Sequence, residues 1–187
     1  AERLAVRSLL AGEQPLARGV MAGFGLQPRP QRLGSVPVAD CPGARFDAQG
    51  TLAVCLEPTE ATWVWQGERR RVPGAHQDAA LWPDLRKVAL STERSLTVTD
   101  TNGQRLGSLA FDRAWPLTQA ADAWAPVVGV KRPTQASLVD VNSVAVIAEA
   151  RCPRGGTALA LAVSPHGESM AVACEGSHLV VVGAGRE

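Results

Sequence analysis

The sequence predicts an all-β fold built from about four repeats of one sheet-forming module, preceded by a short helical hairpin. Runs of β-branched and other apolar residues alternate along the chain with turns rich in Gly, Pro and Asn. This is the pattern of short strands joined by tight reversals. The same runs and turns recur at intervals of roughly 33 to 48 residues, a spacing typical of repeat architectures.

Residues 1–31 differ from the rest of the chain. Leu, Val and Ala recur there at helical spacing, and Gly12 followed by Pro15 divides the segment in two. We therefore expect two short helices with an apolar stripe. The stretch QPRPQR that follows them is expected to be a stiff linker. The predicted domains are 1–31, hairpin and linker, and 32–187, the repeat domain.

The repeat domain begins with a single predicted strand at 32–40, placed before the first repeat. Since the last repeat ends after its third strand, this segment could complete the last sheet and remove an exposed edge. The first repeat, 44–68, contains the apolar run TLAVC and the alternating run TWVW, with polar turns between them.

The second repeat, 80–111, contains KVALS and LTVTD, and its Asn102-Gly103 turn predicts a hairpin into RLGSLAF. An insert at 112–125 breaks the strand pattern and is expected to be a loop with one helical turn. The third repeat begins near Val130. One of its strands is either missing or fused across VNSVAVIAEARC.

The last repeat consists of three apolar runs, LALAV, MAVA and LVVV, separated by two turns. In the first turn Pro165 fixes φ, and Gly167 can adopt the positive φ of a tight reversal. Three strands are therefore predicted at this end of the chain.

The first and last repeats resemble the blades of WD-type β-propellers. The shared features are an apolar strand, a turn of the Ser-Pro-Asp-Gly kind, a second apolar strand and a third strand after a polar turn, although His166 replaces the usual Asp. The resemblance covers roughly 33–187 and implies β-propeller-like blades, about four repeats and possibly a partial ring, that act as a platform for protein partners. The helical segment resembles those that precede propellers in multidomain bacterial signalling proteins.

Composition and residue spacing argue against nucleic acid and membranes as partners, and against a catalytic, cofactor or metal site. The net charge is +1 with 20% charged residues, so neither nucleic acid nor an anionic membrane is an expected partner. The four cysteines are too few and too dispersed for a disulfide-dense scaffold, and no pair has zinc-ligand spacing. Cys55 and Cys174 end matching apolar runs, so we expect them to be small buried side chains. No catalytic, cofactor-binding or metal-binding residue is predicted, since the three histidines lie in turns and loops.

Six residues are candidates for contact with a protein partner. The basic run can bind carboxylates, and exposed aromatic residues commonly anchor interfaces. A solvated strand surface is the alternative for the arginines, and a cover over the core is the alternative for the tryptophans. The candidates are Arg69, Arg70, Arg71, His76, Trp115 and Trp124.

These observations favour a non-catalytic β-propeller module for protein interaction, a scaffold or docking platform. One alternative is a regulatory or sensor part of a larger protease, kinase or ATPase whose catalytic module lies elsewhere. A further alternative is a periplasmic propeller that binds small ligands. The expected location is the cytoplasm, or the periplasm if a signal peptide was removed.

Overall fold

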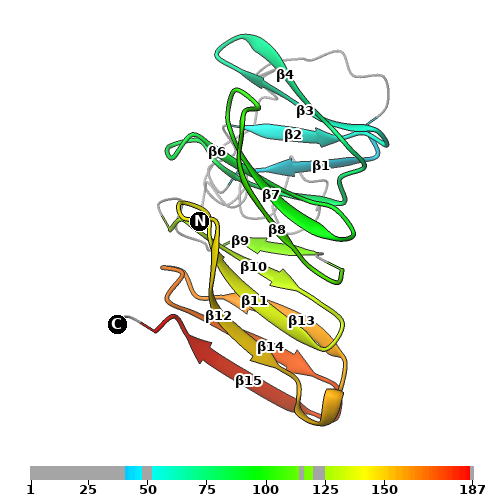
Figure 1. Ribbon diagram of the computed structural model, residues 1–187, viewed down its shortest axis with the longest axis vertical. Helices are drawn as coiled ribbons and strands as arrows, with labels where there is room; N and C mark the ends of the chain where they lie inside the picture. The colour runs from blue at the N-terminus through cyan, green and yellow to red at the C-terminus, as the bar shows by residue number, and fades with distance from the viewer. Residues whose placement is uncertain (1–40, 48–51, 114–115, 120–124, 186–187) are drawn as a thin grey trace, which may run out of the picture. The chain divides into compact units, whose positions relative to one another are not determined.

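A computed structural model describes residues 41–47, 52–113, 116–119 and 125–185. The described residues all belong to one compact unit, and they form four antiparallel sheets (Figure 1). The prediction of an all-β fold with about four sheet-forming repeats is confirmed. The predicted helical hairpin, linker and first strand, at 1–40, lie outside the described residues.

Each sheet is a meander in which neighbouring strands follow one another in the chain. The first sheet contains β1 (Gly43–Phe46), β2 (Ala53–Leu56), β3 (Glu60–Trp65) and β4 (Glu68–Pro73). The second contains β5 (Asp78–Trp82), β6 (Lys87–Ser91), β7 (Ser95–Asp100) and β8 (Arg105–Ala110). The third contains β9 (Leu117–Gln119), β10 (Val127–Lys131), β11 (Gln135–Asp140) and β12 (Ala145–Arg151). After a 3₁₀ turn, η1 (Pro153–Gly155), the fourth contains β13 (Ala158–Val163), β14 (Ser169–Cys174) and β15 (His178–Gly183).

Two predicted turns form as their residues require. In the hairpin between β7 and β8, the Asp100 carboxylate accepts hydrogen bonds from the backbone N–H groups of Asn102 and Gln104, at 2.9 and 2.8 Å. Gly103 has a φ of +89°, and Gly167, between β13 and β14, has a φ of +73°. At Gly167 a Cβ atom would also lie 2.0 Å from Cγ2 of Val127, so the close approach of two sheets requires glycine there.

The third sheet corrects two predictions. The insert at 112–125 is not simply a loop, because Leu117–Gln119 within it forms β9 and pairs with β10. The third repeat was predicted to have one strand either missing or fused across VNSVAVIAEARC, and neither alternative holds, because β9 is a separate strand and that stretch supplies β12. Val130 consequently lies on the second strand of its sheet, whereas its supposed equivalent Trp82 lies on the first.

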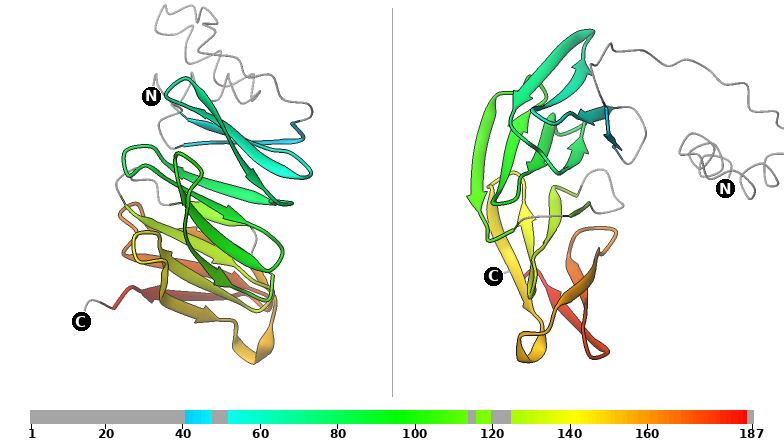
Figure 2. Two further views of the ribbon diagram at one scale, coloured as in Figure 1. Left: turned by 45° about the horizontal axis from the view of Figure 1, so that its top comes forward. Right: turned by 90° about the vertical axis from the view of Figure 1, so that its right-hand side faces the viewer.

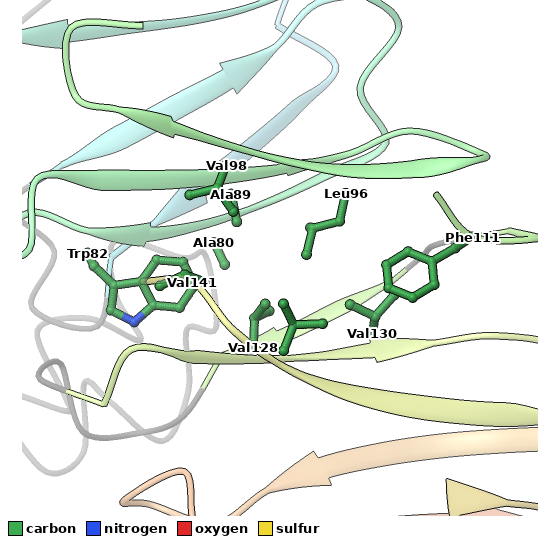
Figure 3. Packing of buried hydrophobic residues seen from close by; sticks show 10 residues of the cluster. Ala80, Trp82, Ala89, Leu96, Val98, Phe111, Val128, Val130 and Val141 are labelled. Carbon is green, nitrogen blue, oxygen red and sulfur yellow. The ribbon is translucent and has the colours of Figure 1, made fainter. Parts of the chain in front are cut away.

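Each pair of successive sheets is joined by a cluster of buried apolar side chains. The cluster between the second and third sheets is typical: Trp82, Leu96 and Val98 pack against Val128 and Val130 (Figure 3). Equivalent clusters join the first sheet to the second and the third to the fourth. The sheets therefore pack face to face in chain order.

Two tryptophans strengthen these junctions by hydrogen bonding across them. The indole N–H of Trp63, on β3, donates to the backbone oxygen of Thr101 in the second sheet's hairpin, at 2.8 Å. The indole N–H of Trp82 donates to the backbone oxygen of Ala125, just before β10, at 2.9 Å. Both rings are almost fully buried, so each donor needs such a partner.

The first strands of the sheets lie beside one another: β1 contacts β5, β5 contacts β9, and β9 contacts β13. Figure 2 shows the sheets following one another as a series. Within the described residues, no apolar cluster joins the first sheet to the fourth. The described sheets therefore form a series that no apolar cluster closes into a ring.

Candidate functional site

In each of the first three sheets, the third strand presents two residues toward the next sheet. They are the second and fourth residues of β3, β7 and β11: Ala61 and Trp63, Leu96 and Val98, Ala136 and Leu138. All six are at most 1% exposed, because the following sheet covers them. The junctions between sheets thus use the same two positions three times.

Strand β15 carries the equivalent residues, and no sheet of the described part of the chain covers them. Its second and fourth residues are Leu179 and Val181, which are 69% and 63% exposed. The alternate residues Val180 and Val182 pack into the cluster shared with the third sheet. Because side chains alternate across a strand, Leu179 and Val181 must point away from the third sheet.

Two complete cross-strand rows extend this apolar surface over the whole sheet. In one row Ala160 lies opposite Ala173, and Ala173 lies opposite Leu179. In the other, Ala162 lies opposite Ala171, which lies opposite Val181. We call these six residues the joining face, namely Ala160, Ala162, Ala171, Ala173, Leu179 and Val181. It is apolar throughout and open on its outer side, whereas isolated exposed apolar residues are ordinary on protein surfaces.

A disulfide anchors the sheet that carries the joining face. Cys152, directly after β12 of the third sheet, is bonded to Cys174 at the end of β14, with a Cα–Cα distance of 5.6 Å. A second disulfide bonds Cys41, just before β1, to Cys55 on β2. All four cysteines are therefore paired, and Cys55 and Cys174 are not, as predicted, simply small buried side chains. The spacing of cysteines does not reveal which strands pack together, so the pairing could not be derived from it.

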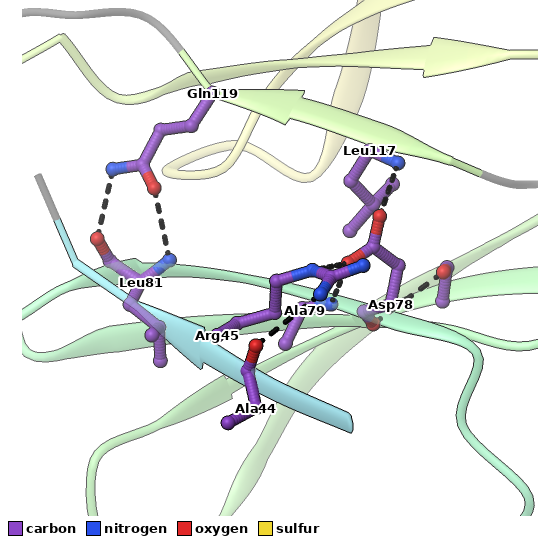
Figure 4. A network of polar contacts seen from close by, with 8 residues as sticks. Ala44, Arg45, Asp78, Ala79, Leu81, Leu117 and Gln119 are labelled. Carbon is purple, nitrogen blue, oxygen red and sulfur yellow. Dashed lines mark hydrogen bonds and ion pairs between the residues drawn. The ribbon is translucent and has the colours of Figure 1, made fainter. Parts of the chain in front are cut away.

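A polar network connects the first strands of three sheets (Figure 4). The buried Asp78 carboxylate, on β5, accepts hydrogen bonds from the Arg45 side chain on β1 and from the backbone N–H of Leu117 on β9, the latter at 2.9 Å. It also accepts one from the backbone N–H of Ala79, at 2.9 Å. One carboxylate thus holds together strands that share no backbone ladder.

Gln119 makes a second connection of the same kind. Its side-chain amide donates to the backbone oxygen of Leu81 at 2.8 Å and accepts from the Leu81 N–H at 3.2 Å. The amide therefore satisfies polar backbone groups at the edge of β5, as a neighbouring strand would. Beside this network lies an open pocket of about 330 Å³, lined by Arg45, Gln77, Asp78 and Pro116.

The arginine run predicted to bind a partner lies on β4, the outer strand of the first sheet. Its members pair with nearby glutamates: Arg69 with Glu57 at 3.4 Å, Arg71 with Glu60 at 3.7 Å, and Arg70 with Glu68. Arg69 and Arg71 alternate with Arg70, so they lie on the opposite face of the sheet.

His76 lies in the loop between β4 and β5 and is partly buried. Burial lowers the pKa of His76 below its ordinary value of 6.5. Trp115 and Trp124, the remaining predicted contact residues, lie outside the described residues. The structure therefore gives no arrangement in which the six predicted residues meet.

Two other features of the described residues concern metal binding and the crossing of a membrane. Among the described residues, no group of three or more His, Cys, Asp or Glu side chains is placed to hold a metal ion. The described part of the chain also contains no helix of the length and hydropathy needed to cross a membrane.

Sequence reasoning identified β15 as a strand and overlooked its exposed face. A signal was present, since HLVVV in β15 matches SLTVT in β7, with Leu and Val at the same two positions. The pattern predicts which residues share a face, but it does not say whether another sheet covers that face.

No family model matches the chain, and no curated protein matches it at the level of sequence. Solved structures do match. One is described as a complex of KlAtg21 with the coiled-coil of AgAtg16: the TM-score is 0.60 at 11% identity, covering 75% of this chain and 51% of that chain. Another is the C-terminal WD40 domain of Sif2, with a TM-score of 0.59 at 14% identity, covering 75% of this chain and 45% of that chain.

A third match is a hydrazine synthase of Kuenenia stuttgartiensis, with a TM-score of 0.56 at 13% identity, covering 82% of this chain and 49% of that chain. The chain therefore spans about half the length of the structures that it matches. Together with the four packed meanders, these similarities show a β-propeller-like fold of the WD-repeat type, in which each sheet is one blade.

Proposed function

We propose that this chain is a non-catalytic module for protein interaction, with the joining face as a principal binding surface. The observation that carries the proposal is the exposure of Leu179 and Val181, at positions that are buried between sheets everywhere else in the series. Covering such an apolar surface with another apolar surface is favourable, because both are removed from water. Rigid scaffolds that present such surfaces are commonly used to bind proteins.

The fold supports this assignment at a general level. One structural neighbour is described as a complex with a coiled-coil from a second protein. Propellers also host many unrelated functions, including parts of enzymes, so the fold supports interaction only as a class. The evidence that comes from this chain itself is the apolar composition of its joining face.

A comparison of two substitutions tests the proposal. The chain, immobilised, is exposed to a soluble extract of its source cells, and retained proteins are quantified for the native sequence, for Leu179→Asp and for Leu106→Asp. Leu106, on β8, is 48% exposed and lies outside the joining face, so it is the matched control. We expect Leu179→Asp to lose partners that Leu106→Asp keeps. Identical retained proteins for both variants would remove the support for this surface.

We also propose the residues predicted from the sequence as separate candidates for contact with a partner. Replacing Trp115 or Trp124 with Ala should weaken partner capture while leaving thermal stability unchanged. A loss of thermal stability would instead place these rings in the core. Arg69 and Arg71 can be tested in the same assay by replacement with Gln, which removes charge but retains hydrogen bonding.

We also propose an oxidising compartment as the working location, and thus the periplasmic alternative in preference to the cytoplasm. All four cysteines are paired in disulfides. Disulfides persist in oxidising compartments and are rare in the reducing cytosol. Mass spectrometry of the protein, alkylated at once on lysis of its source cells, should find both pairs bonded. Four alkylated thiols would contradict this location.

A further inference from the structure

We propose that the joining face of the fourth sheet binds the outer face of the first sheet of a second copy of this chain. This inference rests on the proposed function and specifies its partner. Two copies arranged head to tail would then continue the series of sheets across both molecules.

The joining face has the side-chain pattern that binds a further blade. Leu179 and Val181 occupy the positions of Leu96 and Val98, which are buried against the next sheet. The interface between the second and third sheets therefore shows what covers such a pair, namely the apolar side of another antiparallel sheet (Figure 3). An extended apolar sheet face is therefore the chemistry that this fold itself uses to cover such a pair.

Among the described residues, no sheet precedes the first one at the other end of the series. Its side toward the second sheet contains Val54 and Trp63, which are buried. Its opposite side carries Phe46, which is 64% exposed and lies opposite the exposed Ala53. Ala44, two residues from Phe46, is exposed on the same side. A sheet that precedes the first one would contact these residues.

The exposed apolar residues on the two sides complement each other in size. Four of the six residues of the joining face are alanines, which leave room on β13 and β14 for a large side chain such as Phe46. On the first sheet, one row runs from the exposed Ala44 through the buried Cys55 and Thr62 to Arg71, so the exposed apolar residues of this side lie on β1 and at the start of β2, and an arginine lies at the outer edge. Apolar contact residues with a polar rim that includes Arg are the usual anatomy of a protein interface.

The number of sheets favours a closed pair. This chain covers 45% of a structure described as a WD40 domain, so its four sheets correspond to about half of such a domain. Two copies would supply the other half and give about eight blades, within the range that propellers adopt. A head-to-tail contact that closes on itself yields a finite ring, and here a twofold axis would form two identical contacts at once.

The test measures the mass of the 187-residue chain by sedimentation velocity over a wide range of protein concentration. We expect a reversible dimer. Leu179→Asp and Phe46→Asp should each weaken the dimer by about 30-fold or more, the loss expected when a central interface residue is replaced. Leu106→Asp should leave the dimer unchanged. Both residues at the contact are exposed in the single chain, so circular dichroism and unfolding midpoints should stay at the native values.

Mixing the two weakened variants gives a further, more specific result. In a head-to-tail pair made of one Leu179→Asp chain and one Phe46→Asp chain, both substitutions fall in one contact and the other contact is intact. The mixture should therefore regain dimers that neither variant forms alone. A dimer that Phe46→Asp does not weaken would show that two joining faces meet each other, and it would overturn the head-to-tail arrangement.

The outcome separates this inference from the function on which it rests. If the native chain stays monomeric at every concentration, the second copy is not the partner and the inference is overturned. If the same chain still captures another protein through Leu179, the interaction function stands without it.

Discussion

The second and fourth sheets carry the same pattern of residues in different surroundings. In both, the third strand has Leu and Val at its second and fourth positions, and the neighbouring second strand has Ala on the same side. In the second sheet these side chains are buried against the third sheet. In the fourth sheet the Leu and Val are mostly exposed.

This difference shows that a strand pattern determines which side chains share a face but not whether that face is buried. The alternation of residues fixes which side chains share a face, and the turns fix the register of the hairpins. Whether a face is buried depends on the sheet that packs against it, which is a property of the neighbour. The fourth sheet therefore keeps the composition of an internal junction while standing at the end of the series.

The largest expected difference comes from trimming the same side chain in the two sheets. Leu96→Ala should cost about 2 to 5 kcal/mol of unfolding free energy, because it leaves a cavity between two sheets. Leu179→Ala should cost no more than about 0.5 kcal/mol in the monomer, because its side chain is already in water. Urea unfolding at low protein concentration measures both. Equal losses would mean that Leu179 is covered within the single chain.

Removing the disulfide of the fourth sheet should have the next largest effect. Replacing both Cys152 and Cys174 with Ser should lose about 3 kcal/mol, the value expected for a loop of this length. Among the sheets that the structure describes, the fourth packs on the third alone, so amide hydrogen exchange in β13, β14 and β15 should accelerate most. As the control, replacing Cys41 and Cys55 should accelerate exchange in the first sheet instead. Unchanged exchange in the fourth sheet would show that the apolar cluster alone holds it.

The polar network of the first strands should contribute less. Asp78→Asn should cost about 2 kcal/mol, because a neutral amide cannot accept all three hydrogen bonds of the buried carboxylate. Arg45→Gln should cost less than about 1 kcal/mol, because the arginine is half-exposed and its ion pair is screened. Thermal or urea unfolding of the two variants compares them. A larger loss for Arg45 would place the main contribution in the ion pair.

The smallest effect should be the pH dependence due to His76. Burial lowers its pKa in the folded chain, so the folded state favours the neutral ring and the unfolded chain binds the proton more readily. Its contribution to stability is therefore complete above the ordinary pKa of 6.5 and falls as the pH drops below that value. His76→Gln should flatten this part of the stability profile between about pH 7 and 5. A parallel profile for the variant would assign the dependence to other groups.

The sequence was sufficient for the parts of the fold that depend on local chemistry. The Asn102-Gly103 hairpin and the Gly167 turn were predicted because these residues favour the backbone angles that such turns need. The three strands of the last repeat were predicted because alternation and β-branched residues mark them directly.

The parts that were missed depend on contacts distant in the sequence. β9 has three residues and follows Pro116, so no local pattern marks it, and its pairing with β10 makes it a strand. The Cys152–Cys174 bond requires knowing that two sheets are adjacent. The same limit applied to the candidate site, because the exposure of Leu179 results from the absence of a covering sheet among the described residues.

The most direct test is the rate at which a thiol-reactive maleimide modifies a single new cysteine placed at Leu179 or at Leu96. The native cysteines are all in disulfides and would not react. In dilute protein, Leu179→Cys should react almost as fast as a free peptide thiol, whereas Leu96→Cys should react only as the chain unfolds. The Leu179→Cys rate should then fall as the protein concentration rises and a second copy covers the joining face. Protection of Leu179→Cys in dilute protein, equal to that of Leu96→Cys, would contradict the assignment of the fourth sheet as an open junction.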